Sequence, residues 1–184
     1  MAIIFELWAE CKDEQSLALF VHHFEGFTFN LSAGKEITLY VEVVKKPPSL
    51  FGTRISPSGL SGFGIRTIQD AIDSTEVGLQ LYYHLKFAPD FRFARIAWEA
   101  ENITMSELPE WVERLNNGEK RLEIECVIDN SLYEQLGKPI FCHPFRDGYW
   151  WTRYKGEIYN PLGSSDQQAL REFHRKLFPE HFKY

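Results

Sequence analysis

The chain has 184 residues, of which 44% are hydrophobic, 25% are charged and 15% are aromatic, so it carries enough apolar surface for a dense core and too much for a disordered chain. The formal net charge of −6 is shared evenly, because residues 1–100 carry 9 basic and 12 acidic side chains and residues 101–184 carry 11 and 14. Neither half has a basic arm or stripe, and binding to nucleic acid or to an anionic membrane is therefore not favoured.

The sequence also lacks the usual signs of export and of metal binding. The amino terminus has no basic segment followed by an apolar run, and no stretch approaches the length of a membrane span. Three cysteines, Cys11, Cys126 and Cys142, are far apart and form no CxxC pair, and the histidines show no metal-ligand spacing. We therefore expect a cytoplasmic protein with reduced thiols, no metal and no cofactor.

In chain order, residues 3–10 alternate as a strand. A helical apolar stripe follows between Asp13, placed as its cap, and Gly26, placed to stop it. Two further alternating runs, residues 27–32 and 37–43, predict a hairpin.

Residues 47–64 are rich in proline, glycine and serine and predict a long loop. Thr67 and Asp70 then predict a capping box at the start of a second helix, which should end before Pro89. Residues 91–100 predict a fourth strand. The order β-α-β-β-α-β predicts an α+β, ferredoxin-like unit over residues 1–100: a four-stranded antiparallel sheet with both helices on one face.

Residues 101–184 predict a second α+β half. It contains a short helix around Trp111, a strand at 122–128, a short helix at 131–136, a hairpin at Asp147-Gly148 and a helix that starts at Ser165. From residue 120 the order is β-α-β-β-α, which echoes the first half. The second half is thus a possible related copy, whose antiparallel sheet could join the first sheet edge to edge or pack against its open face, and the two halves could form one domain.

One candidate site is the glycine-bearing loop before the second helix. Flexible glycines ahead of a helix start can cradle a phosphate or carboxylate, and arginine adds a bidentate partner. The spacing matches neither GxGxxG nor the Walker A pattern, and a crossover loop with ordinary caps is the plain alternative. Two residues of the later hairpin, His143 and Arg146, could complete this site from the other side of a cleft. The expected ligand-binding residues are Arg54, Gly62, Gly64, Arg66, Thr67, His143 and Arg146.

The second candidate is a protein-contact surface on the hairpin, because aromatic and arginine side chains dominate binding hot spots. Its residues are Tyr149, Trp150, Trp151, Arg153 and Tyr154. The alternative is that both rows of this strand are buried. Cys142 and His143 are poor catalytic partners, because neighbours in a strand point to opposite faces.

No motif names a reaction or a catalytic residue. The leading hypothesis is a non-enzymatic binding or regulatory protein that acts on a protein partner through the aromatic and arginine surface. One alternative is an enzyme or sensor domain for a small anionic ligand that uses the 52–66 loop. Another is a homo-oligomeric structural protein, since open antiparallel sheets pair at their edges.

Overall fold

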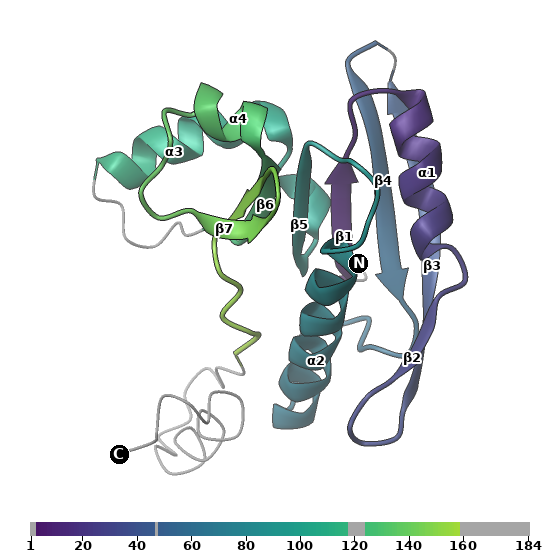
Figure 1. The fold of residues 1–184 in the computed structure, drawn as a ribbon. Coiled ribbons are helices and arrows are strands. Elements are labelled where there is room, and N and C mark those ends of the chain that lie inside the picture. Colours follow the sequence, from purple (N-terminus) through teal and green to yellow (C-terminus); the bar gives the residue numbers. More distant parts are fainter. Residues whose placement is uncertain (1–2, 47, 118–123, 159–184) are drawn as a thin grey trace.

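A computed structural model describes residues 3–46, 48–117 and 124–158. Its centre is one open antiparallel sheet of eight strands in the order β2-β3-β4-β1-β5-β6-β8-β7 (Figure 1). The strands are β1 (Phe5–Glu10), β2 (Thr28–Asn30), β3 (Glu36–Lys46), β4 (Leu50–Pro57), β5 (Phe93–Trp98), β6 (Cys126–Asp129), β7 (His143–Arg146) and β8 (Tyr149–Trp151).

Helices cover both faces of this sheet. They are α1 (Glu14–Phe24), α2 (Ile68–Leu85), α3 (Leu108–Asn116) and α4 (Asn130–Gln135), with short 3-10 turns η1 (Ala100–Asn102) and η2 (Met105–Glu107). One core contains the buried faces of α1 and α2, and a second contains residues of α3 and α4. The α+β class is confirmed. The two halves join edge to edge, because β6 pairs with β5 and continues the same sheet. The expectation that the helices lie on one face only is wrong, because α3 and α4 pack into the second core.

Strand β1 lies at the centre, and all six of its residues are buried. Phe5, Leu7 and Ala9 belong to the α1 and α2 core, as their alternation predicts, and Trp8 belongs to the other core. On the Trp8 face, Glu10 is also buried and accepts hydrogen bonds from Trp8 Nε1 (3.1 Å) and from the backbone N–H of Met105 (2.7 Å). The 3-10 segment thus covers the acidic side of this strand.

The predicted helix boundaries of the first half are confirmed. Asp13 caps α1 by accepting from the backbone N–H of Ser16 at 2.8 Å, and Gly26 follows the helix with φ of +68°. Thr67 and Asp70 form the capping box at the start of α2.

The predicted loop at 47–64 is wrong for residues 50–57, because these eight residues form strand β4 between β3 and β1. The proline, glycine and serine residues of this segment obscure an alternating strand pattern in which the side chains of Thr53 and Ile55 are fully buried. Gly52 serves packing here, since a Cβ atom at this position would lie 2.7 Å from Cη2 of Trp8. The hairpin partner of β3 is therefore mainly β4, and β2 adds only three residues.

In the second half, α3, α4 and the β7–β8 hairpin form where the sequence predicts them. Asp147-Gly148 makes the turn, with Gly148 at φ of +76°, and Pro144 lies on the outermost strand. The predicted helix that starts at Ser165, and the first residues of the predicted 122–128 strand, fall outside the described residues.

Candidate functional site

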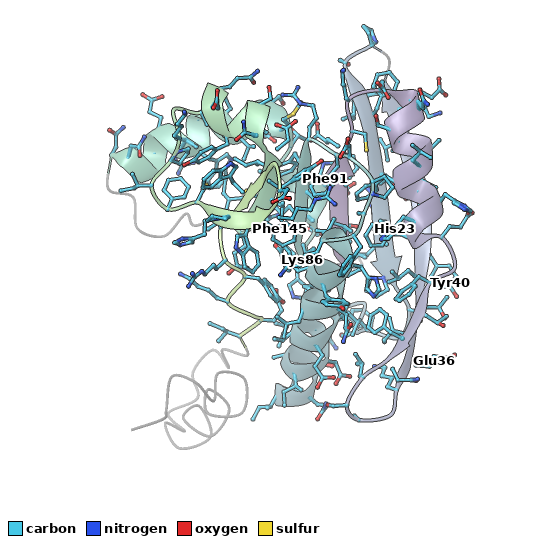
Figure 2. All side chains as sticks on the ribbon, in the orientation of Figure 1. His23, Glu36, Tyr40, Lys86, Phe91 and Phe145 are labelled. Atoms are coloured by element: carbon cyan, nitrogen blue, oxygen red, sulfur yellow. The ribbon has the colours of Figure 1, made fainter. Side chains whose placement is uncertain are left out.

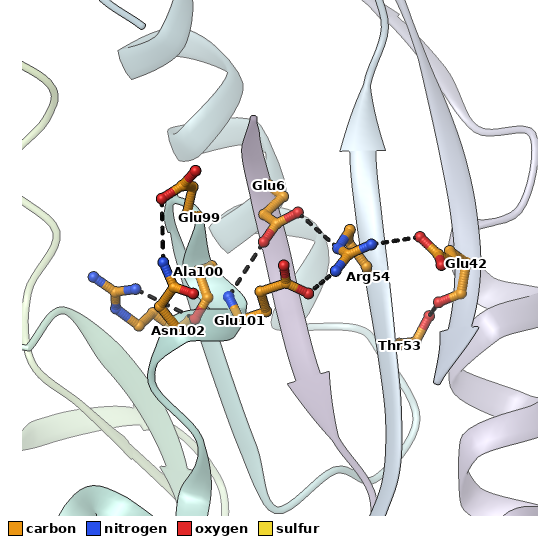
Figure 3. A network of polar contacts seen from close by, with 9 residues as sticks. Glu6, Glu42, Thr53, Arg54, Glu99, Ala100, Glu101 and Asn102 are labelled. Carbon is orange, nitrogen blue, oxygen red and sulfur yellow. Dashed lines mark hydrogen bonds and ion pairs between the residues drawn. The ribbon is translucent and has the colours of Figure 1, made fainter. Parts of the chain in front are cut away.

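Arg54 lies in β4 and is the centre of an ion-pair network (Figure 3). Its Nε is 3.1 Å from Glu6 Oε2, its Nη1 is 2.6 Å from Glu42 Oε2, and its Nη2 contacts Glu101. Three carboxylates occupy the whole guanidinium fork, so Arg54 has no free edge for an anionic ligand. The prediction that Arg54 lies on a loop is wrong, because Arg54 lies in β4, and its guanidinium is taken up by these three carboxylates.

This network changes the protonation of Glu6, whose side chain is only 2% exposed. Burial raises the pKa of Glu6 from 4.5 to about 7, against the lowering effect of Arg54. One cation shared among three carboxylates leaves excess negative charge, and the most buried carboxyl holds the proton most readily. The network connects β4 to β1, β3 and η1.

In the loop between β4 and α2, residues 58–67, the backbone N–H groups nearest the helix are already hydrogen-bonded within the chain. The Asp70 carboxylate accepts from the backbone N–H groups of Arg66 (3.0 Å) and Thr67 (2.8 Å), and Arg66 lies over the ring of Phe63. The O of Gly62 accepts from the backbone N–H of Ile3 (3.0 Å). The N-terminus of α2 thus already holds a carboxylate where the anion was expected.

His143 and Arg146 lie on β7, which is separated from β4 by four strands. At about 4.8 Å per strand step, they do not converge with Arg54. Arg146 Nη1 instead donates to the carbonyl oxygens of Ala88 (2.5 Å) and Lys86 (3.3 Å), just beyond α2, and its guanidinium lies 4.1 Å from the centre of the Tyr149 ring. The structure does not bring the predicted ligand-binding set together.

The aromatic residues of the hairpin pack inside the molecule. Trp151 meets Tyr82 and Tyr149 is buried, whereas Trp150 stacks on Tyr133 on the other face with ring centres 4.0 Å apart. Of the five expected contact residues, only Arg153 is exposed. The alternative of two buried rows fits these positions better than an exposed hot spot does.

Residues 152–158, here called the strap, run from β8 onto α2. Tyr154 packs where a Cβ atom of Gly78 would stand, and the backbone N–H of Glu157 donates to Thr75 Oγ1 (2.9 Å). Glu125 accepts from the backbone N–H of Lys155 (2.9 Å), and burial raises the pKa of Glu125 to about 7. These contacts anchor the strap and leave its buried groups partnered.

A cleft of about 700 Å³ lies among the described residues. Four segments that are distant in sequence form it: the β1–α1 junction, the residues before β5, the β6–α4 junction and the β7–β8 turn. Phe91 lies between α1 and α4 in Figure 2. The lining residues are Lys12, Asp13, Ser16, Asp90, Phe91, Arg92, Asp129, Asn130, Ser131, Gln135, Gly148 and Tyr149.

The floor of the cleft is held by hydrogen bonds. The Tyr149 hydroxyl accepts from the N–H of Phe91 (3.1 Å) and donates to its carbonyl oxygen (3.0 Å). Arg92 Nε lies 3.3 Å from Asp129 Oδ2, and Asp129 Oδ1 accepts from the N–H of Leu132 (2.6 Å) to cap α4. The site is therefore preformed, with both signs of charge on its walls.

The pKa values of two titratable groups in the cleft are shifted further from 7. Hydrogen bonds from Ser16 hold the pKa of the Asp13 carboxyl below its usual range, and burial raises the pKa of the Tyr149 hydroxyl. Neither group can exchange a proton readily near pH 7, so this pair suits binding better than acid–base catalysis.

Sequence reasoning missed this cleft because its residues meet only through strand order. A usable signal was present, since Lys12 and Asp13 lie just beyond the end of β1, and Asp129 and Asn130 lie where β6 ends and α4 begins. Because β5 is antiparallel to both β1 and β6, the last residues of β1 and of β6 lie on either side of the first residue of β5.

Within the described ranges, no group of three or more histidine, cysteine or acidic side chains could hold a metal ion. Burial raises the pKa of the Cys11 and Cys126 thiols to about 12, which disfavours the thiolate that metal binding and nucleophilic attack require. No helix in the described part of the chain is both long and apolar enough to cross a bilayer.

Comparison with known proteins gave no match among family models, curated proteins or solved structures.

Proposed function

We propose that the chain binds a small polar ligand in the cleft between α1 and α4. The observation that carries this proposal is the cleft of about 700 Å³ with preformed hydrogen-bonded walls, a size typical of small-molecule sites. This keeps the hypothesis of a sensor or enzyme for a small anionic ligand, but moves the site away from the 52–66 loop.

The lining residues define the ligand class. Lys12 is exposed at one wall and can pair with a carboxylate or phosphate. Asn130, Ser131 and Gln135 offer neutral donors and acceptors at the opposite wall, and Asp90 is a carboxylate acceptor. A molecule with one anionic group and several hydroxyl or amino groups, such as an amino acid or a sugar phosphate, satisfies both walls.

A thermal-shift panel of amino acids, sugar phosphates and dicarboxylates tests this proposal, because a ligand bound by the native state raises its stability. For any hit, Lys12→Glu should weaken affinity about tenfold or more. Arg153→Glu is the matched control, since Arg153 is an exposed cation outside the cleft. A panel without a hit, or equal losses in both variants, would count against the cleft.

The protein-binding hypothesis keeps a second candidate surface, on α2. Leu79, Tyr83 and Phe87 are spaced four residues apart and are 55%, 57% and 63% exposed, and the last two rings are 5.3 Å apart. Such a row of large apolar side chains is typical of a contact site. A photo-reactive residue at position 83 should cross-link to a partner in cells, whereas the control at Leu19, exposed on α1, should not.

The ferredoxin-like relationship of residues 1–100 also stays a proposal. Its support is the order β3-β4-β1-β5 within the sheet, with α1 and α2 packed into one core. The additional strand β2 and the continuation into β6, β8 and β7 depart from a four-stranded unit. A solved structure of this protein with an independent strand assignment would test the relationship.

A further inference from the structure

The outer edge of β3 is a row of backbone groups with no strand beside it in the described part of the chain. Strand β2 pairs only with residues 36–38 of β3, and the N–H of Leu39 donates to the carbonyl oxygen of Phe27. Beyond Leu39, β3 runs on to Lys46 at the margin of the sheet, beside α1 (Figure 1), and Tyr40 marks this margin in Figure 2.

The direction of these backbone groups follows from two contacts. The carbonyl oxygen of Glu42 accepts from Thr53 Oγ1 of β4, so the backbone groups of Glu42 point toward β4. The backbone N–H of Leu39 donates to Phe27, so the backbone groups of Leu39 point away from β4. Since backbone groups alternate along a strand, Val41, Val43 and Lys45 present their N–H and carbonyl groups at the free edge.

We propose that two copies of this chain pair antiparallel through the edges of β3. In a symmetric dimer the same segment lies on both sides, and only outward-facing residues can exchange hydrogen bonds. The register centred on Val44 meets this condition, because it sets Val43 of one copy opposite Lys45 of the other. The same register sets Glu42 opposite Lys46, twice.

Side-chain charge selects this register over its neighbours. A register centred on Glu42 would set two carboxylates face to face, and one centred on Lys45 would set two ammonium groups face to face. The register centred on Val43 would set Glu42 opposite Val44 and form no charge pair. Only the Val44 register gives two opposite-charge cross-strand pairs, which stabilise a sheet where like charges weaken it.

The surface beside the free edge of β3 also fits a second copy of the chain. A groove of about 260 Å³ lies between α1 and β3, with apolar walls from Leu17, Ala18 and Val21 and with Val43, 45% exposed, on the strand side. Glu14 and Glu25 also line it. In the Val44 register, Lys45 of the second copy lies opposite Val43 on the α1 side of the sheet, where it faces the apolar walls and the Glu25 carboxylate. Glu14 already pairs with Lys45 of its own chain at 2.6 Å.

Charge reversals test the dimer and its register together. We expect a dimer for the full chain by sedimentation velocity at micromolar concentration. Glu42→Lys alone creates two lysine pairs and Lys46→Glu alone creates two glutamate pairs, so each variant should raise the dissociation constant about tenfold or more. An equimolar mixture of the two variants restores both opposite-charge pairs and should form a heterodimer.

Glu36→Lys is the control, because Glu36 lies on β3 outside the paired segment, and it should leave the dimer intact. Circular dichroism and thermal unfolding of each variant report folding, which matters most for Glu42→Lys because this variant also removes the contact between Glu42 and Arg54 of the same chain. The mixture also guards against misfolding as an explanation, since a misfolded variant would not be rescued by its complement. A monomeric wild type would overturn the proposal and assign Lys45 and Lys46 to edge protection instead. Dimerisation unaffected by either reversal, or no rescue in the mixture, would overturn it as well.

Discussion

The indole ring of Trp8 fills the space that a side chain on Gly52 would need. A Cβ atom at Gly52 would lie 2.7 Å from Cη2 and 2.8 Å from Cζ2 of Trp8, in the middle of the sheet. Gly52→Ala should therefore lower the free energy of unfolding by about 1–3 kcal/mol through overpacking. Urea unfolding measures this loss.

Gly62→Ala is the matched control for that experiment, because no atom lies within 4 Å of its added methyl group. Its stability should stay level or rise by up to about 1 kcal/mol. Equal losses at both glycines would show that chain flexibility, and not the Trp8 contact, explains the first result.

The raised pKa of Glu6 makes stability depend on pH. Its pKa is about 7 in the folded protein and 4.5 ordinarily, so the native state binds the proton more tightly than the unfolded chain does. Its contribution is complete below about pH 4.5 and is lost as pH rises through about 7, on the order of 3 kcal/mol in all. Glu125 adds a loss in the same window.

Unfolding at several pH values checks this dependence. Glu6→Gln should flatten the decline between pH 5 and pH 8 and leave the stability at pH 5 little changed. Glu42→Gln removes the exposed member of the same network, and the decline should persist. A Glu6→Gln profile parallel to that of the wild type would contradict the assignment.

Arg146 holds the segment after α2. Its Nη1 donates to the carbonyl oxygens of Ala88 and Lys86, and its plane lies over the Tyr149 ring. Arg146→Lys cannot reproduce the fork or the stacking and should cost about 1–3 kcal/mol. The exposed Arg153→Lys should cost less than about 0.5 kcal/mol. Thermal unfolding of both variants makes the comparison.

The thiols should differ in reactivity according to burial. Cys11 and Cys126 are buried with pKa values raised to about 12, whereas Cys142 is partly exposed. At pH 8 a thiol reagent should modify Cys142 first and leave the other two unmodified until urea is added. Rapid modification that survives in Cys142→Ser would show that another thiol is accessible.

Local signals predicted the helices well, because a cap such as Asp13 or Thr67 acts within its own turn. Strand β4 was missed because its composition resembles a loop. The need for glycine at position 52 comes from its contact with Trp8, which is 44 residues away in the sequence. The partners of Arg54 come from β1, β3 and η1, and no local pattern links them. The cleft likewise depends on which strand ends meet.

The strap has a practical consequence for dividing the chain. Its contacts with Thr75 and Gly78 mean that residues after β8 complete the surface of a helix formed by residues 68–85. A fragment cut at residue 100 would uncover that helix flank and also strip β5 of its β6 neighbour. A truncation anywhere before Ile158 should therefore destabilise the part of the chain that remains.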